Sequence, residues 1–281
     1  MYPTVFSRNQ RGLSLVELMV AMALSSFLIL GVTQIYLDNK RNYLYQQGQG
    51  ENVENGRFAL MLISERLAKA GYRRNPALTM DIAFPLQTGA GHVVGCNFAA
   101  GQAVVRVDDA TLCLRYQPRD ENETNCLGNT FSGTSDLSTP YDSDTTQAHF
   151  SSNEIIVEKI ALADGSLKCS VRDQAAQELV SNIAGLYFDY GVNGDISLLK
   201  VNSYTTTPGS GDIIRALRYS TLLVASTNNL TQGVESKICS NPNNEDEIGD
   251  WEKLTGQTLT CESGRLYQMI SSSSTLRNLM P

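Results

Sequence analysis

The residues with the clearest chemical role lie near the N-terminus, where Gly12 precedes a long apolar run that contains one acidic side chain. Between Leu13 and Leu37, Glu17 is the only residue that carries a charge at neutral pH. A carboxylate inside a bilayer costs about 2.5–3.5 kcal/mol on insertion scales unless it has a partner. The nearest candidate for a positively charged partner is an amine. The two charges can then pair within one chain or between neighbouring chains, and the alternative is a glutamate that snorkels to the membrane surface.

The apolar run has the length and flanking charges of a membrane helix. Residues 18–37 can cross a hydrocarbon core of ~30 Å as a helix. Arg8 and Arg11 stand just before the run, which places that end in the cytoplasm by the positive-inside rule. An ordinary secretory signal has its apolar stretch before the cleavage site. Here the order is reversed, so we expect the helix to remain in the mature protein and to anchor an exported domain.

Cysteines are the second group of reactive side chains, and all six follow the membrane segment. They are Cys96, Cys113, Cys126, Cys169, Cys239 and Cys261. This placement predicts disulfides in an oxidising periplasm, and six cysteines allow 15 pairings. Closure of short loops favours Cys113 with Cys126 and Cys239 with Cys261, which leaves Cys96 with Cys169. A zinc site is disfavoured because no two cysteines stand two to four residues apart, and His92 and His149 are remote.

Composition excludes several other classes of function. The chain of 281 residues has a formal net charge of −7 and no cluster of Lys and Arg, so direct binding of nucleic acid is not expected. No phosphate loop, dinucleotide-binding glycine pattern, nucleophile elbow or metalloprotease helix occurs, so we expect no catalytic residues, no cofactor and no enzyme. Acidic loops that contain Asp142, Asp144, Asp195 and Asp246 offer oxygen ligands for calcium, although solvated turns explain them as well.

The elements that position these residues predict an α+β fold. Residues 13–37 form the membrane half of a first helix and 38–71 its amphipathic half, with glycines near 48–56 that predict a bend or a thinner stretch. Residues 72–281 form a β-rich periplasmic domain with a mostly antiparallel sheet and long loops, including 122–146 and 202–211. The expected strands are 103–107, 111–116, 154–161, 166–171, 185–190, 196–201 and 215–225.

The N-terminal pattern resembles a known processing signal. Gly12 followed by Leu13 to Glu17 is similar to the class III signal of type IV pilins and type II secretion pseudopilins. The segments 54–60, 70–73, 179–192 and 213–223 resemble the PilW family of minor pilins. The resemblance implies a long first helix packed on a sheet, cleavage after Gly12 by a prepilin peptidase and methylation of the new N-terminus. Glu17 then becomes the fifth mature residue, with a role in subunit assembly. Two departures are Leu13 in place of phenylalanine and Gln34 in place of a helix-breaking proline.

This resemblance implies a role in a fibre. The chain would be a minor pilin that joins other minor pilins and the major pilin, primes pilus assembly and sits at the fibre tip, alone or with a tip adhesin. It would lie in the inner membrane before assembly and in an extracellular pilus afterwards, serving twitching motility, attachment or DNA uptake. Alternatives are a minor pseudopilin of a type II secretion system, a tip adhesin and, least favoured, a membrane-anchored enzyme.

Overall fold

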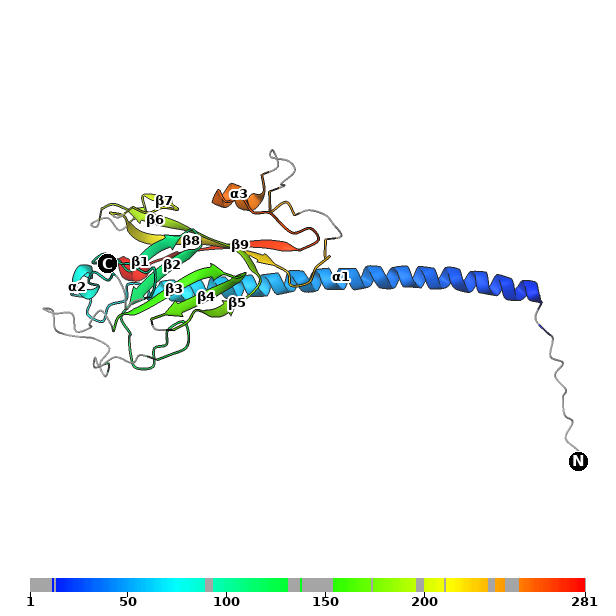
Figure 1. Ribbon diagram of the computed structural model, residues 1–281, viewed down its shortest axis with the longest axis horizontal. Helices are drawn as coiled ribbons and strands as arrows, with labels where there is room; N and C mark the ends of the chain where they lie inside the picture. The colour runs from blue at the N-terminus through cyan, green and yellow to red at the C-terminus, as the bar shows by residue number, and fades with distance from the viewer. Residues whose placement is uncertain are drawn as a thin grey trace, which may run out of the picture. The chain divides into compact units, whose positions relative to one another are not determined.

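The protein consists of two compact units joined by one helix. The computed structural model describes residues 12, 14–88, 93–130, 137, 154–172, 174–195, 200–209, 211–231, 236–240 and 248–280. The units are Met1–Gln47 and Gly48–Pro281, and helix α1 (Leu15–Lys69) is continuous through the boundary (Figure 1). The long first helix is therefore confirmed, and it continues through the glycines near residues 48–56.

In the first unit, α1 exposes its apolar side chains. Every described residue from Ser14 to Tyr43 is exposed, and Phe27 and Leu28 retain 81% and 70% of their accessible surface. Large exposed apolar surfaces of this kind mark contacts with a membrane or with other proteins. In a helix the backbone N–H and C=O groups form hydrogen bonds with one another, as the interior of a bilayer requires.

The second unit contains two antiparallel sheets, which confirms the α+β class. One has the order β1-β2-β3-β4-β5 and the other the order β7-β6-β8-β9. The strands of the first are β1 (Val104–Asp108), β2 (Thr111–Tyr116), β3 (Ile156–Ala163), β4 (Ser166–Val171) and β5 (Gln177–Val180). Those of the second are β6 (Ile183–Asn193), β7 (Ser203–Thr205), β8 (Ile213–Val224) and β9 (Tyr267–Thr275).

The C-terminal half of α1 and the inner faces of both sheets share one hydrophobic core. The helix contributes a buried stripe of Ala59, Ile63 and Leu67 at three- and four-residue spacing. The first sheet contributes residues such as Leu112 and Ile160, which are register partners on neighbouring strands. Burial of these faces removes apolar surface from water, which is the main driving force for folding. The sheets are therefore positioned by the helix that they cover.

Two glycines of α1 allow this close packing. A Cβ atom added to Gly48 would lie 2.6 Å from Leu230 Cδ1, and one added to Gly56 would lie 2.5 Å from Ile270 Cδ1. Both glycines are buried. Glycine in a helix interior costs about 1 kcal/mol relative to alanine. At these two positions glycine is nevertheless needed, because a larger side chain would collide with the side chains packed on the helix. Gly48 and Gly56 are thus contact positions.

Short helices lie in the loops outside the two sheets. α2 (Met80–Ala83) and the turn η1 (Arg277–Leu279) lie in the loops that follow α1 and β9. α3 (Asp250–Thr255) places Trp251, which is 1% exposed, against Gly185 of β6. A Cβ at Gly185 would be 2.7 Å from Trp251 Cζ2, so only glycine leaves room for the indole ring.

The disulfides join Cys96 to Cys113, Cys126 to Cys169, and Cys239 to Cys261. The expected Cys239–Cys261 pair is confirmed, whereas the pairs Cys113–Cys126 and Cys96–Cys169 were wrong. Cys113 faces Lys159 in the β-ladder, and Cys169 faces Ile160. Because successive side chains of a strand point to opposite faces, Cys113 and Cys169 lie on opposite sides of the sheet. Cys96 packs on the outer face and Cys126 on the inner face. Short loop length therefore predicted Cys239–Cys261 correctly but failed for the four cysteines around the first sheet.

Several strands differ from those that the sequence predicts. Four expected strands overlap β1 to β4. The expected strand 185–190 lies within β6, and the expected strand 215–225 overlaps β8. β5 and β9 were missed, and β7 lies in a stretch expected to be a loop. Most of the expected strand 196–201 lies outside the described residues. β9 contains four consecutive serines, so its conformation is set by pairing with β8 and not by propensity.

We predict that Gly185→Ala lowers the free energy of unfolding by about 1–3 kcal/mol, because the added methyl group must displace the buried Trp251 ring. Urea titration of the full-length protein in detergent measures this change. Gly194→Ala is the matched control, since a Cβ there meets no atom within 4 Å. Equal stability of the two variants would contradict the packing described here.

Candidate functional site

At the beginning of α1, Glu17, the predicted assembly residue, contacts the backbone of Ser14. The backbone N–H of Ser14 donates a hydrogen bond of 3.3 Å to Glu17 Oε2, and Leu18 N–H donates to Ser14 O. Ser14 and Glu17 have the spacing of a capping box, in which an acidic side chain satisfies a free N–H at a helix start. Ser14 was missed in the sequence, although its spacing from Glu17 is the signal that identifies it.

This geometry gives Glu17 a local partner in the uncleaved chain. Gly12 is exposed, and Leu13 lies outside the described residues. A backbone N–H neutralises no charge, so the carboxylate of Glu17 still lacks a cation among the described residues of its own helix turn. The site can therefore accept an ammonium group, and the sequence-based role of Glu17 stays a prediction.

Within the described residues, α1 is the one helix long and apolar enough to cross a membrane, and its apolar stretch is not buried in the protein. The stretch begins directly at the capping box. The acidic side chain and the membrane-compatible surface are thus adjacent parts of one site at the start of the helix.

At the opposite end of α1, a buried carboxylate connects the helix to the first sheet. Glu158 of β3 is completely buried, and its Oε1 accepts hydrogen bonds of 2.8 Å from the Tyr116 hydroxyl and from Cys126 N–H. Arg66 Nη1 of α1 lies 3.6 Å from the same oxygen. Charged groups this deeply buried require partners, and these three supply them. This cluster was not predicted, because its members are separated by up to 92 positions in sequence.

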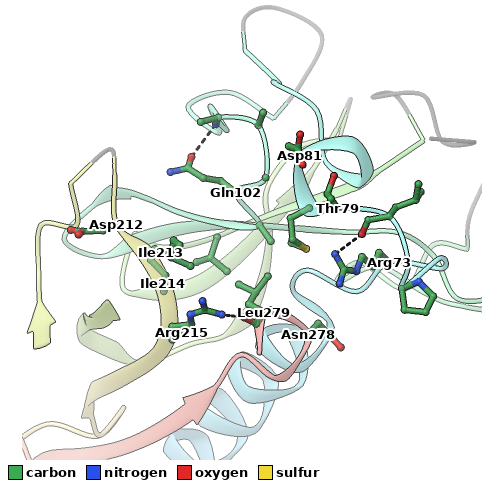
Figure 2. A pocket seen from close by; sticks show the side chains of 18 of the residues that line it. Arg73, Thr79, Asp81, Gln102, Asp212, Ile213, Ile214, Arg215, Asn278 and Leu279 are labelled. Atoms are coloured by element: carbon green, nitrogen blue, oxygen red, sulfur yellow. Dashed lines mark hydrogen bonds between the residues drawn. The ribbon is translucent and has the colours of Figure 1, made fainter. Parts of the chain in front are cut away.

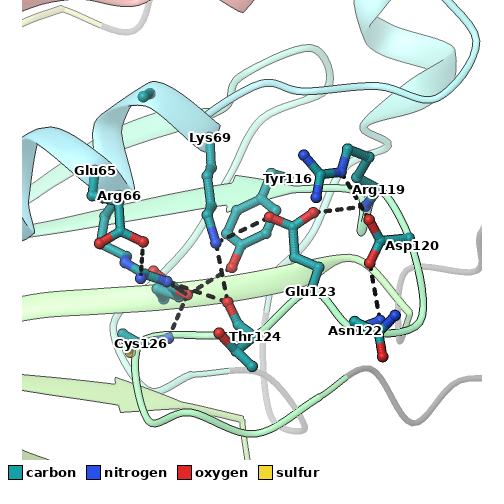
Figure 3. Close-up of polar contacts among 12 residues, drawn as sticks. Glu65, Arg66, Lys69, Tyr116, Arg119, Asp120, Asn122, Glu123, Thr124 and Cys126 are labelled. Atoms are coloured by element: carbon teal, nitrogen blue, oxygen red, sulfur yellow. Dashed lines mark hydrogen bonds and ion pairs between the residues drawn. The ribbon is translucent and has the colours of Figure 1, made fainter. Parts of the chain in front are cut away.

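The loop between β2 and β3 completes this cluster. Lys69 of α1 forms an ion pair of 3.0 Å with Glu123 and donates a hydrogen bond of 3.1 Å to Thr124 O, which also accepts from Arg66 (Figure 3). Cys126, in the same loop, is joined to Cys169 of β4. The disulfide therefore holds the loop where it can bind the last turn of the helix.

Burial raises the pKa of Glu158, and the nearby Arg66 guanidinium opposes this effect only in part. Burial and the Glu158 carboxyl group also raise the pKa of Tyr116, so its hydroxyl stays protonated and can donate. Oε2 of Glu158 has no hydrogen-bond partner among the described residues. The cost of burying the charge of Glu158 is thus only partly offset by its partners, so ionisation of Glu158 opposes folding.

A second buried charge, Arg115, organises the loops on the outer face of the first sheet. Its guanidinium donates to Gln102 O at 2.5 Å, Pro85 O at 2.7 Å, Ala99 O at 2.9 Å and Phe84 O at 3.0 Å. The charge also lies 4.6 Å from the centre of the Phe98 ring. Burial lowers the pKa of Arg115 to about 9, so the group remains charged at neutral pH. Sequence alone does not distinguish this arginine from those on the surface.

The loops held by Arg115 form one wall of a cavity of about 680 Å³ (Figure 2). The other walls come from residues after α1, from the start of β8 and from η1. The lining residues are Arg73, Pro76–Asp81, Ala99–Val104, Gly211–Arg215, Asn278 and Leu279. Arg73 donates to Leu78 O at 2.7 Å and Arg215 donates to Leu279 O, so both cations brace the walls. A hydrogen bond from the Thr79 hydroxyl lowers the pKa of Asp81, which therefore remains ionised at neutral pH.

The other metal and acidic candidates are explained by local structure where they are described. Cys126, Glu158 and Cys169 place ligand atoms within 4.8 Å of one another, but the two sulfur atoms are joined in a disulfide. Asn193 Oδ1 accepts a hydrogen bond from Asp195 N–H, as in an ordinary turn. The remaining calcium and histidine candidates, Asp142, Asp144, Asp246, His92 and His149, lie outside the described residues.

Comparison with known proteins finds one motif at the N-terminus. Residues 7–33 match the family model for the prokaryotic N-terminal methylation motif, a stretch that contains both Gly12 and Glu17. Among solved structures, the chain is similar to a type IV-like pilin, TTHA1219 from Thermus thermophilus, with a TM-score of 0.40 and 12% identity. The alignment covers 79% of this chain and 94% of that one. A search of curated proteins gave no match.

We predict that the stability of the protein decreases as pH rises above about 4.5, the usual pKa of glutamate, through the contribution of Glu158. Because its pKa is raised in the folded state, the unfolded chain loses this proton at lower pH, so deprotonation favours unfolding. Urea titrations of the wild type and Glu158→Gln from pH 4 to pH 8 isolate the effect. The stability difference between the two proteins should shift in favour of the variant as pH rises, and a constant difference would contradict it.

Proposed function

We propose that this protein is a minor pilin of a type IV pilus, processed after Gly12 and assembled through the first half of α1. The observation that carries the proposal is the exposed apolar half of α1, which lies largely within the matched methylation motif and contains Glu17 as its one charge. A helix of this kind is stable in a bilayer and in a bundle of similar helices. The boundaries follow the sequence: leader 1–12, membrane half 13–37, amphipathic half 38–71 and periplasmic domain 72–281.

Glu17 is the proposed assembly residue. Cleavage converts the Leu13 amide to an ammonium group, which competes with Ser14 N–H for the carboxylate. At a separation of about 4 Å and an effective dielectric constant of about 20, the attraction is about 4 kcal/mol. That value offsets the insertion cost of about 2.5–3.5 kcal/mol for an unpaired carboxylate. Pairing with the N-terminus of a neighbouring chain therefore favours lateral packing of subunits. Small residues such as Ala21, Ser25 and Gly31 support this packing because they allow helices to approach closely.

The finer assignment is to the PilW family, in a complex that primes assembly and remains at the fibre tip. The resemblance of residues 54–60, 179–192 and 213–223 to that family supports it. Partners would be other minor pilins, the major pilin and the prepilin peptidase. Co-purification followed by mass spectrometry tests this assignment, and recovery of secretion-system subunits in place of pilus subunits would make the chain a pseudopilin.

We expect Glu17→Ala to leave cleavage largely intact but to reduce incorporation into fibres about tenfold or more, because the variant loses the proposed ion pair. Immunoblots of sheared fibres and of membranes measure incorporation and processing separately. Glu54→Ala, at an exposed glutamate on the same helix, is the control. Normal incorporation of Glu17→Ala would refute the assembly role.

N-terminal sequencing of the protein from cells tests the processing step. We expect the mature chain to begin at Leu13 with a methylated amine, since the peptidase of the motif family cuts after the glycine. Gly12→Val should keep the leader in place because a branched side chain replaces the glycine at the cut. A mature chain that begins at Met1, or well beyond the apolar stretch, would exclude the proposal.

A further inference from the structure

The outer edge of β9 is an open β-ladder. β9 pairs with β8 over nine consecutive residues, from Tyr267 with Val224 to Thr275 with Ala216, without a register shift. It is the last strand of its sheet, so among the residues that the structure describes no strand pairs with its other edge. Ser271, Ser273 and Thr275 are exposed. A long, regular and accessible edge of this kind is able to accept another strand.

The hydrogen bonds that flank β9 determine which backbone groups point outward. Leu276 N–H donates to Arg215 O, and Ala225 N–H donates to Leu266 O. In an antiparallel ladder, hydrogen-bonded pairs alternate with pairs whose backbone groups point away. Ser271 and Ser273 therefore direct their N–H and C=O groups to the open edge, as do Tyr267, Met269 and Thr275. Within the described part of the chain, no hydrogen bond occupies these outward groups.

The other sheet edges carry features that prevent strand addition, whereas β9 does not. β7 has three residues and β5 has four, with an irregular register against β4. β1 has a register shift and the charged side chains Arg106 and Asp108. β9 has nine residues and contains no proline and no charged residue. Natural proteins block edges that are not used in binding. The unblocked edge of β9 is therefore the exception that needs a function.

We infer that the β9 edge binds an extended strand of a different polypeptide, in which apolar residues alternate with small polar ones. The chemistry follows from the two sides of the edge. On the inner side, Ile270 packs against Gly56 of α1, and the half-buried Val53 and Leu60 share that helix face. They form an apolar surface beside the added strand. On the outer side, Ser271 and Ser273 favour small polar neighbours.

The direction of β9 disfavours antiparallel pairing with a second copy of this chain. Asn52 of α1 donates to Leu266 O at the start of β9, and Asn278 beyond its end donates to Ala68 O. β9 therefore runs parallel to the C-terminal half of α1. Antiparallel pairing of two β9 strands would direct the two helices oppositely, which a common membrane does not allow. This last step rests on the proposed function.

The experiment uses a synthetic probe with the chemistry that the edge requires. A nine-residue fluorescent peptide alternates valine with serine or threonine and carries N-methyl groups on every second amide, so that only one of its edges can pair. Fluorescence anisotropy measures its binding to the full-length protein in detergent, with empty micelles as a blank. A peptide with every amide methylated is the control, because neither of its edges can pair.

Two variants of the protein link binding to the β9 edge. Ser273→Pro removes one outward N–H and leaves the β8 ladder intact, whereas Ser273→Ala keeps the N–H. We expect Ser273→Pro to weaken peptide binding about tenfold and Ser273→Ala to leave it unchanged, since one or two hydrogen bonds are lost only in the first. If Ser273→Pro fails to fold, Ser273→Lys tests the same edge by placing a charge on it.

Three results would overturn the inference. The first is that the peptide methylated on every second amide does not bind, and the second is that the fully methylated peptide binds equally well. The third is that the Ser273→Pro and Ser273→Ala proteins bind the peptide with equal affinity. Concentration-dependent dimers that Ser273→Pro abolishes would assign the edge to a second copy instead. These measurements do not involve cleavage or fibre assembly, so the inference and the proposed function can fail separately.

Discussion

The structure of the second unit depends on burial of one face of α1 against two sheets at once. Ala59, Ile63 and Leu67 contact a core to which both sheets contribute, and Gly48 and Gly56 allow strands and loops to approach the helix backbone. A helix that packs against two sheets needs small residues at the positions where strands and loops lie closest to its backbone. The same helix must also carry exposed apolar residues in the first unit. One continuous element thus satisfies two different environments.

Buried charges fix the loops around this core. Glu158 connects the last turns of α1 to β3 and to the loop that contains Cys126, and Arg115 gathers four backbone carbonyl groups on the other side of the same sheet. Burial of either charge is costly unless its hydrogen-bond partners are in place. Glu158 and Arg115 therefore each favour the one arrangement of loops that supplies those partners. The disulfides act in the same way, because one lies on each face of the first sheet. The domain is therefore held by local constraints on both sides of a sheet as well as by its core.

The sequence predicted the regular elements better than the contacts between them. Enrichment in β-branched and aromatic residues predicted strands that overlap β3 and β8, because residue composition is a local property of the chain. β9 was missed because its four serines have no such pattern. The pairs Cys113–Cys126 and Cys96–Cys169 were wrong because the side of the sheet on which a cysteine lies depends on strand register. Ser14 was overlooked as a capping residue, although its spacing from Glu17 was visible.

By itself, the sequence determined the methylation motif, the apolar helix, the lone charge of Glu17 and the α+β class, since each follows from the order and period of nearby residues. Only the tertiary structure decided which cysteines meet, that Glu158 and Arg115 are buried, and that β9 ends its sheet with a regular, uncharged edge. These features depend on contacts between residues far apart in the chain. Many pairings are compatible with the local sequence, and only packing around α1 selects among them.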